Sequence, residues 1–335
     1  MRVAINGFGR IGRAVTRLIE SREGVELVHI NDLAPTDMLA YLLRRDSVHG
    51  SWDVPVVAVE DGIEIAGRLI PVTKEKDPSK LPWAALDVDV VLECTGAFTT
   101  REQCAVHLAA GAKRVLLSAP AKGPVDATIV VGVNDDTYDP AKHFVVSCAS
   151  CTTNCLAPLV KALHEAFGIL RGTMTTIHAY TMDQALLDSP HRKGDFTRGR
   201  AAAINIVPTS TGAAKAIGLV YPPLAGKLDG LAIRVPVPDG SLTDLDIDVA
   251  REVTLDEVKA ALHAAALGPM RGVLEVSDDP LVSSDIVGNP HSCIVDAHQT
   301  YVIDGRMVKV LAWYDNEWGF ANRMVDLALI LGGTP

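Results

Sequence analysis

The chain has 335 residues, of which 48% are apolar and 21% are charged, a composition typical of soluble globular proteins that are large enough for two hydrophobic cores. Its formal net charge of −10 argues against a surface that binds nucleic acid or an anionic membrane. Its six scattered cysteines argue against a disulfide-stapled fold, and no apolar run approaches the roughly 20 residues of a membrane-spanning helix.

The first half of the chain alternates short β-branched runs with helical patterns. The runs that suit strands buried on both faces are 3–6, 25–31, 88–93, 114–118, 128–133 and 144–147. Helical patterns cover 10–21 and 101–110. This alternation predicts an α/β fold whose N-terminal part is a Rossmann-type, doubly wound parallel sheet.

Longer strands of alternating polarity follow in the second half. A helix is expected over 151–167, ended by Gly168, and Thr254 with Glu257 forms a capping box for a second helix. The expected strands are 173–180, 231–238, 244–253 and 307–315, with a loop at 181–207 and a last amphipathic helix at about 318–331. The period of two predicts an α+β domain with a mostly antiparallel sheet.

A glycine-rich segment, INGFGRIGR, directly follows the first expected strand. Gly7 permits a tight turn, Gly9 lets the backbone approach a pyrophosphate, and Gly12 lets the helix pack on the strand. The second strand ends at Asp32, whose carboxylate can bind both ribose hydroxyls of an adenosine and would repel a 2′-phosphate. The segment predicts a dinucleotide site that prefers NAD to NADP. The alternative is a structural turn, with Asp32 capping the next helix.

Three cysteines, Cys148, Cys151 and Cys155, lie within eight positions. Structural zinc takes four nitrogen or sulfur ligands, and no second cysteine or histidine pair completes such a set, so no metal site is expected. Cys151 falls where a strand ends and a helix begins, and the free amides and dipole there are expected to lower the pKa of its thiol. Cys155, one turn further on, is expected to be buried and inert. His178 is the candidate base. A buried small residue is the alternative interpretation of Cys151.

The order and spacing of six segments resemble the phosphorylating glyceraldehyde-3-phosphate dehydrogenases over essentially the whole chain. These segments are INGFGRIGR, SCTTNCLAP, TTIHAYT, PTSTGAAKA, RVPVP and WYDNEWG. The resemblance implies a nucleotide-binding domain over 1–150, completed by a C-terminal helix at 315–335, and a catalytic domain over 151–314. It implies NAD-dependent oxidation of glyceraldehyde 3-phosphate, with inorganic phosphate, to 1,3-bisphosphoglycerate. It also implies a homotetramer in which the loop 181–207 reaches a neighbouring subunit.

The resemblance assigns a role to particular side chains. Cys151 is implied to form a thiohemiacetal and then a thioester, with His178 as base, and its backbone amide resembles half of an oxyanion site. The residues implied to bind the substrate phosphate or inorganic phosphate are Ser150, Thr152, Thr181, Asp183, Arg198, Thr211, Gly212 and Arg234. Those implied to bind the cofactor are Gly7, Gly9, Arg10, Ile11, Gly12, Asp32, Lys76, Thr95, Ser118 and Asn316.

Three positions depart from the family pattern. Cys148 replaces an asparagine and forms C-x-x-C with the nucleophile; a protective disulfide is one hypothesis, and a plain small-residue substitution is the alternative. Thr197 stands where the family's phosphate-contacting arginine aligns, with Arg198 beside it. Ser189 stands where strictly NAD-specific members often carry leucine, which leaves some NADP use open.

Two related enzymes and one non-catalytic class are the alternatives. Erythrose-4-phosphate dehydrogenase shares the thiol and histidine but hydrolyses its thioester, and an acyl-phosphate reductase such as aspartate-semialdehyde dehydrogenase has a similar architecture. A redox sensor or RNA-binding protein on this scaffold is the third, although the acidic charge disfavours RNA. The N-terminal segment MRVAINGFGR lacks the build of a signal peptide, so a cytoplasmic protein without nucleic-acid or membrane partners is expected.

Overall fold

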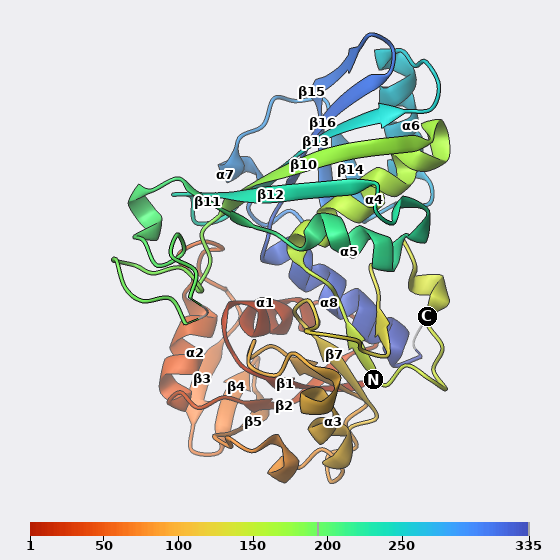
Figure 1. Ribbon diagram of the computed structural model, residues 1–335. Coiled ribbons are helices and arrows are strands. Elements are labelled where there is room, and N and C mark those ends of the chain that lie inside the picture. Colours follow the sequence, from red (N-terminus) through yellow and green to blue (C-terminus); the bar gives the residue numbers. More distant parts are fainter. Residues whose placement is uncertain (193, 334–335) are drawn as a thin grey trace. The chain divides into compact units, whose positions relative to one another are not determined.

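The computed structural model describes residues 1–192 and 194–333 (Figure 1). The chain divides into two compact units. The first comprises Met1–Ser150 together with the chain from Ala321 onward, and the second comprises Cys151–Phe320.

A nine-stranded sheet forms the centre of the first unit, in the order β3-β4-β5-β2-β1-β6-β7-β9-β8. The parallel strands are β1 (Arg2–Asn6), β2 (Glu26–Asn31), β6 (Val90–Glu93), β7 (Arg114–Leu117), β8 (Ala127–Thr128) and β9 (Val145–Ser147). The helices are α1 (Arg10–Ile19), α2 (Thr36–Arg44) and α3 (Arg101–Ala109). The parallel Rossmann-type sheet predicted from the alternating pattern is therefore confirmed.

An antiparallel meander extends this sheet beyond the predicted strands. It consists of β3 (Val56–Val59), β4 (Gly62–Ile65) and β5 (Arg68–Thr73), and β5 joins β2 in parallel. Neither this meander nor α2 was predicted from the sequence. In the meander, β3 and β5 are short and only partly buried, so their pattern is weak.

The predicted strand at 128–133 is wrong. Only Ala127 and Thr128 belong to β8, and the chain then turns away from the sheet, passing through Gly132 with a positive φ of 81°. The Asn134 side chain causes this turn by accepting from the Val130 amide at 2.8 Å and donating to the Thr128 carbonyl at 2.9 Å. These bonds replace those that a neighbouring strand would otherwise supply.

In the second unit, seven strands form a mostly antiparallel sheet, in the order β11-β12-β10-β13-β16-β15-β14. The strands are β10 (Ile169–Ala179), β11 (Val207–Ser210), β12 (Leu228–Val235), β13 (Ser241–Val249), β14 (Leu274–Ser277), β15 (Cys293–Ile303) and β16 (Met307–Tyr314). The parallel pairs are β10 with β12 and β14 with β15. Along β13 every second side chain is buried, as the predicted period of two requires.

Helices pack against this second sheet (Figure 1). They are α4 (Cys151–Phe167), α5 (Ala213–Val220) and α6 (Leu255–Leu267); a short α7 (Ser283–Ile286) follows. The predicted bounds of α4 are confirmed, with Gly168 at a φ of +71° after its end. The capping box is confirmed too, since the Thr254 hydroxyl accepts from the Glu257 amide at 3.2 Å.

The last helix, α8 (Trp318–Leu331), contributes most of its length to the first unit. Arg22 forms an ion pair with Asp326 at 3.2 Å and donates to the Asn322 side chain at 3.0 Å. The hydroxyl of Tyr138 donates to the Leu331 carbonyl at 3.2 Å. Among the residues that the structure describes, no helix combines the length and apolar character needed to cross a membrane.

Candidate active site

Cys151 and His178 meet in the second unit. Cys151 is the first residue of α4 and His178 lies near the end of β10, with 3.4 Å between Sγ and Nε2. The other ring nitrogen, Nδ1, lies 2.7 Å from the Ala179 carbonyl oxygen, which can only accept a hydrogen bond. Nδ1 also lies 3.1 Å from Arg234 Nη1, but the two hydrogens of that nitrogen are donated to the Ala179 carbonyl and the Thr181 hydroxyl, each at 3.0 Å. Nδ1 therefore carries the proton, and the unprotonated Nε2 faces the thiol, as a general base requires.

Arg234 lies beside this pair because β12 runs parallel to β10 with Arg234 in register with His178. Its Nη1 donates to the Ala179 carbonyl and to the Thr181 hydroxyl, each at 3.0 Å. The carbonyl of Ala179 thus accepts from both the imidazole and the guanidinium, which fixes the orientation of the ring and places a positive charge next to it.

The prediction of a lowered pKa for the Cys151 thiol is wrong, although the Thr152 amide at the helix start does lower it. Although Cys151 keeps some exposure to solvent, desolvation raises the pKa of its thiol to about 11, against the opposing effects of Arg234 and Thr152. Burial, reinforced by Arg234, lowers the pKa of His178 to about 3. At neutral pH the pair is therefore a neutral thiol beside a neutral imidazole, and the base receives a proton only when the sulfur attacks.

Tyr314 supports the pair and was not identified from the sequence. Its hydroxyl lies 2.9 Å from Thr152 Oγ1 and 2.8 Å from Thr176 Oγ1, and its ring packs edge-on against His178 with 5.9 Å between ring centroids. These contacts tie α4 and β10 to the end of β16. Its position on the covered face of a predicted alternating strand, in the segment WYDNEWG, was the available signal.

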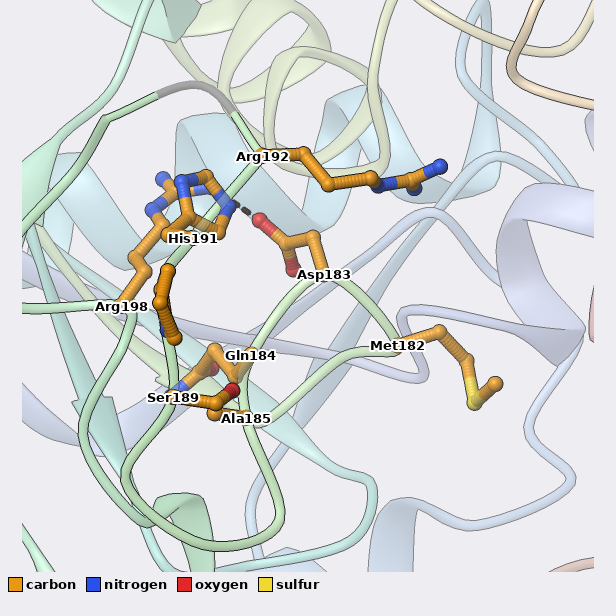
Figure 2. A pocket seen from close by; sticks show the side chains of 9 residues that line it. Met182, Asp183, Gln184, Ala185, Ser189, His191, Arg192 and Arg198 are labelled. Atoms are coloured by element: carbon orange, nitrogen blue, oxygen red, sulfur yellow. Dashed lines mark hydrogen bonds and ion pairs between the residues drawn. The ribbon is translucent and has the colours of Figure 1, made fainter.

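Next to the pair is a cluster of charged and hydroxyl groups. Asp183 pairs with Arg198 (Figure 2). Asp183 also accepts from the Thr181 hydroxyl, and the Nε of Arg198 lies 3.1 Å from Thr209 Oγ1. Burial raises the pKa of Asp183, but Thr181, Arg198 and Arg234 together hold it below its usual range. Two guanidinium groups, those of Arg198 and Arg234, therefore face this cluster, an arrangement that suits a phosphate group.

The structure distinguishes Thr197 from Arg198. The hydroxyl of Thr197 donates to Asp195 at 2.8 Å, and the amides of both residues donate to the same carboxylate, at 2.9 and 3.0 Å. Asp195 thus shapes a turn that directs Arg198, not Thr197, to Asp183. A guanidinium reaches the cluster from the position after the one that the family pattern specifies.

The remaining predicted phosphate residues lie at two helix starts. Thr152 is in the first turn of α4, and Ser150 precedes that helix at the end of the first unit. Gly212 is the N-cap of α5, with no capping side chain, and Thr211 Oγ1 accepts from the Ala213 amide at 3.2 Å. Free amides at a helix start favour an anion.

The first unit contains a cleft of about 480 Å³ at the ends of β1, β2 and β6. Its lining includes five of the predicted cofactor residues: Gly7, Gly9, Asp32, Lys76 and Thr95. A cleft of this size is within the range of small-molecule sites. Ser118 follows β7, where its amide donates to the Glu93 carbonyl at 3.0 Å. In the second unit, the side chain of Asn316 accepts from the Ser241 hydroxyl at 2.6 Å.

The cleft fits the adenosine and pyrophosphate of a dinucleotide. A Cβ on Gly9 would meet nothing within 4 Å, so its backbone is open to a ligand, whereas a Cβ on Gly12 would lie 2.4 Å from the Gly7 oxygen. Gly9 is also the N-cap of α1, whose first residues are Arg10 and Ile11, and no side chain caps the free amides. They are available to a pyrophosphate.

The carboxylate of Asp32 is held in place at the edge of this cleft. Its two oxygens accept from the amides of Phe8 and Ala34, at 2.7 and 2.9 Å. The Arg10 side chain points elsewhere and pairs with Asp46 at 2.6 Å. The ribose end of the cleft therefore carries a fixed acidic group.

The other cysteines near Cys151 are buried. Cys155 is fully buried, as predicted, with its sulfur 3.8 Å from the Ala312 carbonyl. Cys148 is also fully buried. The hypothesis of a disulfide between Cys148 and Cys151 stays a prediction.

Comparison with known proteins adds relatives for both units. Two family models match: glyceraldehyde 3-phosphate dehydrogenase, NAD binding domain, over residues 1–101, and glyceraldehyde 3-phosphate dehydrogenase, C-terminal domain, over residues 150–316. Glyceraldehyde-3-phosphate dehydrogenase 2 of Streptomyces avermitilis is 55% identical over 333 residues, which cover 99% of this chain and 98% of the relative. Glyceraldehyde-3-phosphate dehydrogenase of Geobacillus stearothermophilus and glyceraldehyde-3-phosphate dehydrogenase 1 of Bacillus subtilis are each 55% identical over 328 residues, which cover 98% of this chain and 97% of the relative.

Proposed function

Because the chain belongs to the glyceraldehyde-3-phosphate dehydrogenase family, we propose that it oxidises glyceraldehyde 3-phosphate with NAD and inorganic phosphate to 1,3-bisphosphoglycerate. The observation that carries the proposal is the 3.4 Å contact between the Cys151 sulfur and the unprotonated Nε2 of His178. A nucleophile and a base at this separation can open an acyl-transfer reaction.

The chemistry begins at this contact. Cys151 Sγ attacks the aldehyde carbon while His178 Nε2 accepts the thiol proton and passes it to the aldehyde oxygen, which gives a thiohemiacetal. NAD, when bound, supplies the hydride acceptor. Loss of hydride from the carbon and of the hydroxyl proton to His178 Nε2 leaves a thioester on Cys151. Inorganic phosphate then displaces the sulfur and releases the acyl phosphate, so the oxidation energy is kept in the product.

Two groups of residues would hold the two phosphates. Thr181 and Arg234, with Asp183 and Arg198 beside them, suit the phosphate of the substrate, because paired guanidinium groups bind phosphate oxygens with directed hydrogen bonds. Ser150, Thr152, Thr211 and Gly212 suit the attacking phosphate, because they supply hydroxyls and helix-start amides.

For the cofactor, we propose a preference for NAD with some use of NADP. The carboxylate of Asp32, held by two amides, would repel the 2′-phosphate of NADP. Ser189, where strictly NAD-specific members often carry leucine, is less restrictive, so the preference is expected to be incomplete.

A homotetramer in the cytoplasm completes the proposal. Within 181–207, the side chains of Met182, Leu186 and Phe196 are 87%, 81% and 93% exposed. A monomer rarely keeps such an apolar surface in water, and a neighbouring subunit would cover it. The free thiols of all six cysteines suit a reducing compartment. Light scattering of the purified protein would give the mass of four chains, and a monomeric mass would refute the tetramer.

The initial rate of reduced-cofactor formation tests the function. Glyceraldehyde 3-phosphate should support a rate with NAD that depends strongly on inorganic phosphate and falls, but does not vanish, when NADP replaces NAD. A phosphate-independent rate, or a faster one with erythrose 4-phosphate, would move the assignment to the enzyme that hydrolyses its thioester. No rate with either aldehyde would favour a sensor or binding protein.

A further inference from the structure

Four neighbouring strands of the first unit each end in a polar residue, and these residues form one hydrogen-bonded row. Thr73 ends β5, Asn31 ends β2, Asn6 ends β1 and Glu93 ends β6. The Thr73 hydroxyl donates to Asn31 Oδ1 at 2.8 Å, Asn31 Nδ2 donates to Asn6 Oδ1 at 2.8 Å, and Asn6 Nδ2 donates to Glu93 Oε2 at 2.6 Å. Asn6, Asn31 and Glu93 are buried, and Glu93 is fully so.

Backbone groups set the direction of this row. Asn31 Oδ1 accepts from the Glu75 amide at 2.9 Å and Asn31 Nδ2 donates to the Glu75 carbonyl at 2.9 Å, so the orientation of the Asn31 amide is fixed. Thr73, which must donate to Asn31, can only accept from His29 Nε2 at 3.0 Å. Every donor therefore points toward Glu93, and such aligned chains strengthen each bond.

A second series of hydrogen bonds reaches Glu93 from α3. Trp83 Nε1, which can only donate, lies 3.0 Å from His107 Nδ1. Nδ1 is therefore the acceptor, and His107 Nε2 carries the proton that it donates to Glu93 Oε2 at 3.1 Å. The other oxygen, Oε1, accepts from the amide of Thr95 at 2.8 Å and from its hydroxyl. Each carboxylate oxygen thus receives two donors.

Two residues of the row, Asn6 and Asn31, line the cofactor cleft themselves. Gly7 follows Asn6, Asp32 follows Asn31, and Thr95 comes two positions after Glu93. All three line the cleft, whereas Glu93 and Thr73 are outside its lining. The segments that carry Gly7 and Thr95 also lie close together, since a Cβ on Gly7 would come within 2.5 Å of the Thr95 amide nitrogen. A displacement of Thr95 would therefore reach the glycine turn.

We propose that Glu93 is a positioning residue for cofactor binding. It accepts hydrogen bonds from both series of donors, and through Thr95 and Asn6 it sets the shape of the adenosine and pyrophosphate end of the cleft. The proposal rests on the proposed NAD-dependent function. It concerns affinity for the nucleotide and not the chemistry at Cys151, because Glu93 lies outside the cleft lining and bonds Asn6, Thr95 and His107 of its own unit.

The test is Glu93→Gln. A glutamine at this site must point its NH₂ group at one of two pairs of donors, Asn6 with His107 or the two groups of Thr95, so neither orientation is satisfied. The tautomer of His107 cannot adjust, because Trp83 donates to its other nitrogen. Calorimetry should give a Kd for NAD, and for AMP as a probe of the adenosine end alone, raised by roughly tenfold, since one buried unsatisfied donor costs about that factor.

A matched control separates positioning from general loss of stability. Asp126 is a carboxylate of the same unit that accepts from Arg101 and from the amides of Phe144 and Val145, and it is outside the cleft lining. Asp126→Asn should destabilise the fold yet leave both Kd values unchanged. In Glu93→Gln, kcat at saturating NAD and the rate at which iodoacetamide alkylates Cys151 without cofactor should match the parent.

Unchanged Kd values in folded Glu93→Gln would overturn the proposal. An equal rise of both Kd values in Asp126→Asn would overturn it as well. If Glu93→Gln does not fold, Thr73→Val decides. It removes the far end of the row without touching the cleft, and it should weaken AMP binding to a smaller degree; an unchanged Kd refutes the proposal. A parent protein that binds neither NAD nor AMP would instead refute the proposed function.

Discussion

At the scale of single residues, the neutral thiol and imidazole make the reaction depend on proton transfer within one contact. His178→Asn should lower kcat by roughly 10²- to 10⁴-fold, the usual contribution of a general base, because the buried thiol of Cys151 then lacks a group to receive its proton. The KM for aldehyde should change little. Stopped-flow measurement of the first turnover checks this effect.

The matching control is His263→Asn, which removes an exposed histidine of α6 far along the chain from the site. It should leave kcat intact. A loss of similar size in both variants, or an alkylation rate of Cys151 unaffected by His178→Asn, would contradict the role of His178 as base.

Cys148 is the residue whose role the fold leaves as a prediction. If it protects the nucleophile, peroxide should first oxidise Cys151 to a sulfenic acid, and the Cys148 thiol should then displace water to form a disulfide. Mass spectrometry of the intact protein would show a loss of two hydrogens that reductant reverses. In Cys148→Ser the same treatment should give irreversible oxidation. Only sulfenic acid or mixed adducts on Cys151 of the parent would refute the disulfide.

At the scale of elements, the turn built on Asp195 decides which residue delivers a guanidinium. Arg198→Ala should raise the KM for glyceraldehyde 3-phosphate by roughly tenfold or more, since hydrogen bonds to charged groups are worth at least that factor. Thr197→Val is the matched control, because it loses only a hydroxyl that bonds Asp195. If initial-rate kinetics show a larger rise in the KM for Thr197→Val than for Arg198→Ala, the register of this loop is different from the one described.

The capping box of α6 is a second element-scale test. Thr254→Ala removes the hydroxyl that accepts from the Glu257 amide and should lower the free energy of unfolding by about 1 kcal/mol. Thr254→Ser keeps an oxygen at the same place and should retain most of that stability. Urea denaturation of both variants measures the difference, and equal destabilisation would show that the cap contributes nothing.

At the scale of the whole molecule, His29 is expected to link stability to pH. Burial lowers its pKa to about 4, and Nδ1 has no hydrogen-bond partner within the described part of the chain. His29 therefore binds a proton near pH 6.5 in the unfolded chain but only near pH 4 in the folded protein. The contribution of His29 to the free energy of unfolding is complete above pH 6.5. As the pH falls to 4 this contribution is lost, which lowers the free energy of unfolding by up to about 3 kcal/mol.

Urea midpoints measured from pH 7.5 to 4.5 check this dependence. His29→Gln, which has no titrating group, should show a shallower decline with falling pH. An identical decline in parent and variant would assign the acid sensitivity in this pH range to other groups.

Much of the fold, and the pairing of Cys151 with His178, could be predicted from the sequence. The glycine spacing, the position of Cys151 at a strand-to-helix junction and the bounds of α4 are local features, set by turns, helix starts and side-chain periodicity within a few residues. The predicted strand at 128–133 was wrong for the opposite reason, because a single side chain, Asn134, supplies the hydrogen bonds that a neighbouring strand would otherwise supply. The meander β3–β5 was missed because its strands are short and β3 and β5 are only partly buried, so the sequence pattern is weak.

The sequence by itself determined the family, the position of Cys151 at a helix start and the glycine spacing of the nucleotide-binding domain, since these depend on residue types at fixed short spacings. Only the tertiary structure decided which nitrogen of His178 faces the thiol, that burial outweighs the helix terminus in setting the pKa of Cys151, and that Arg198 rather than Thr197 reaches Asp183. It also revealed Tyr314 and the row that ends at Glu93. One physical reason explains why the sequence alone did not decide these features. Desolvation and hydrogen-bond direction depend on groups that are distant in sequence and meet only when the chain folds.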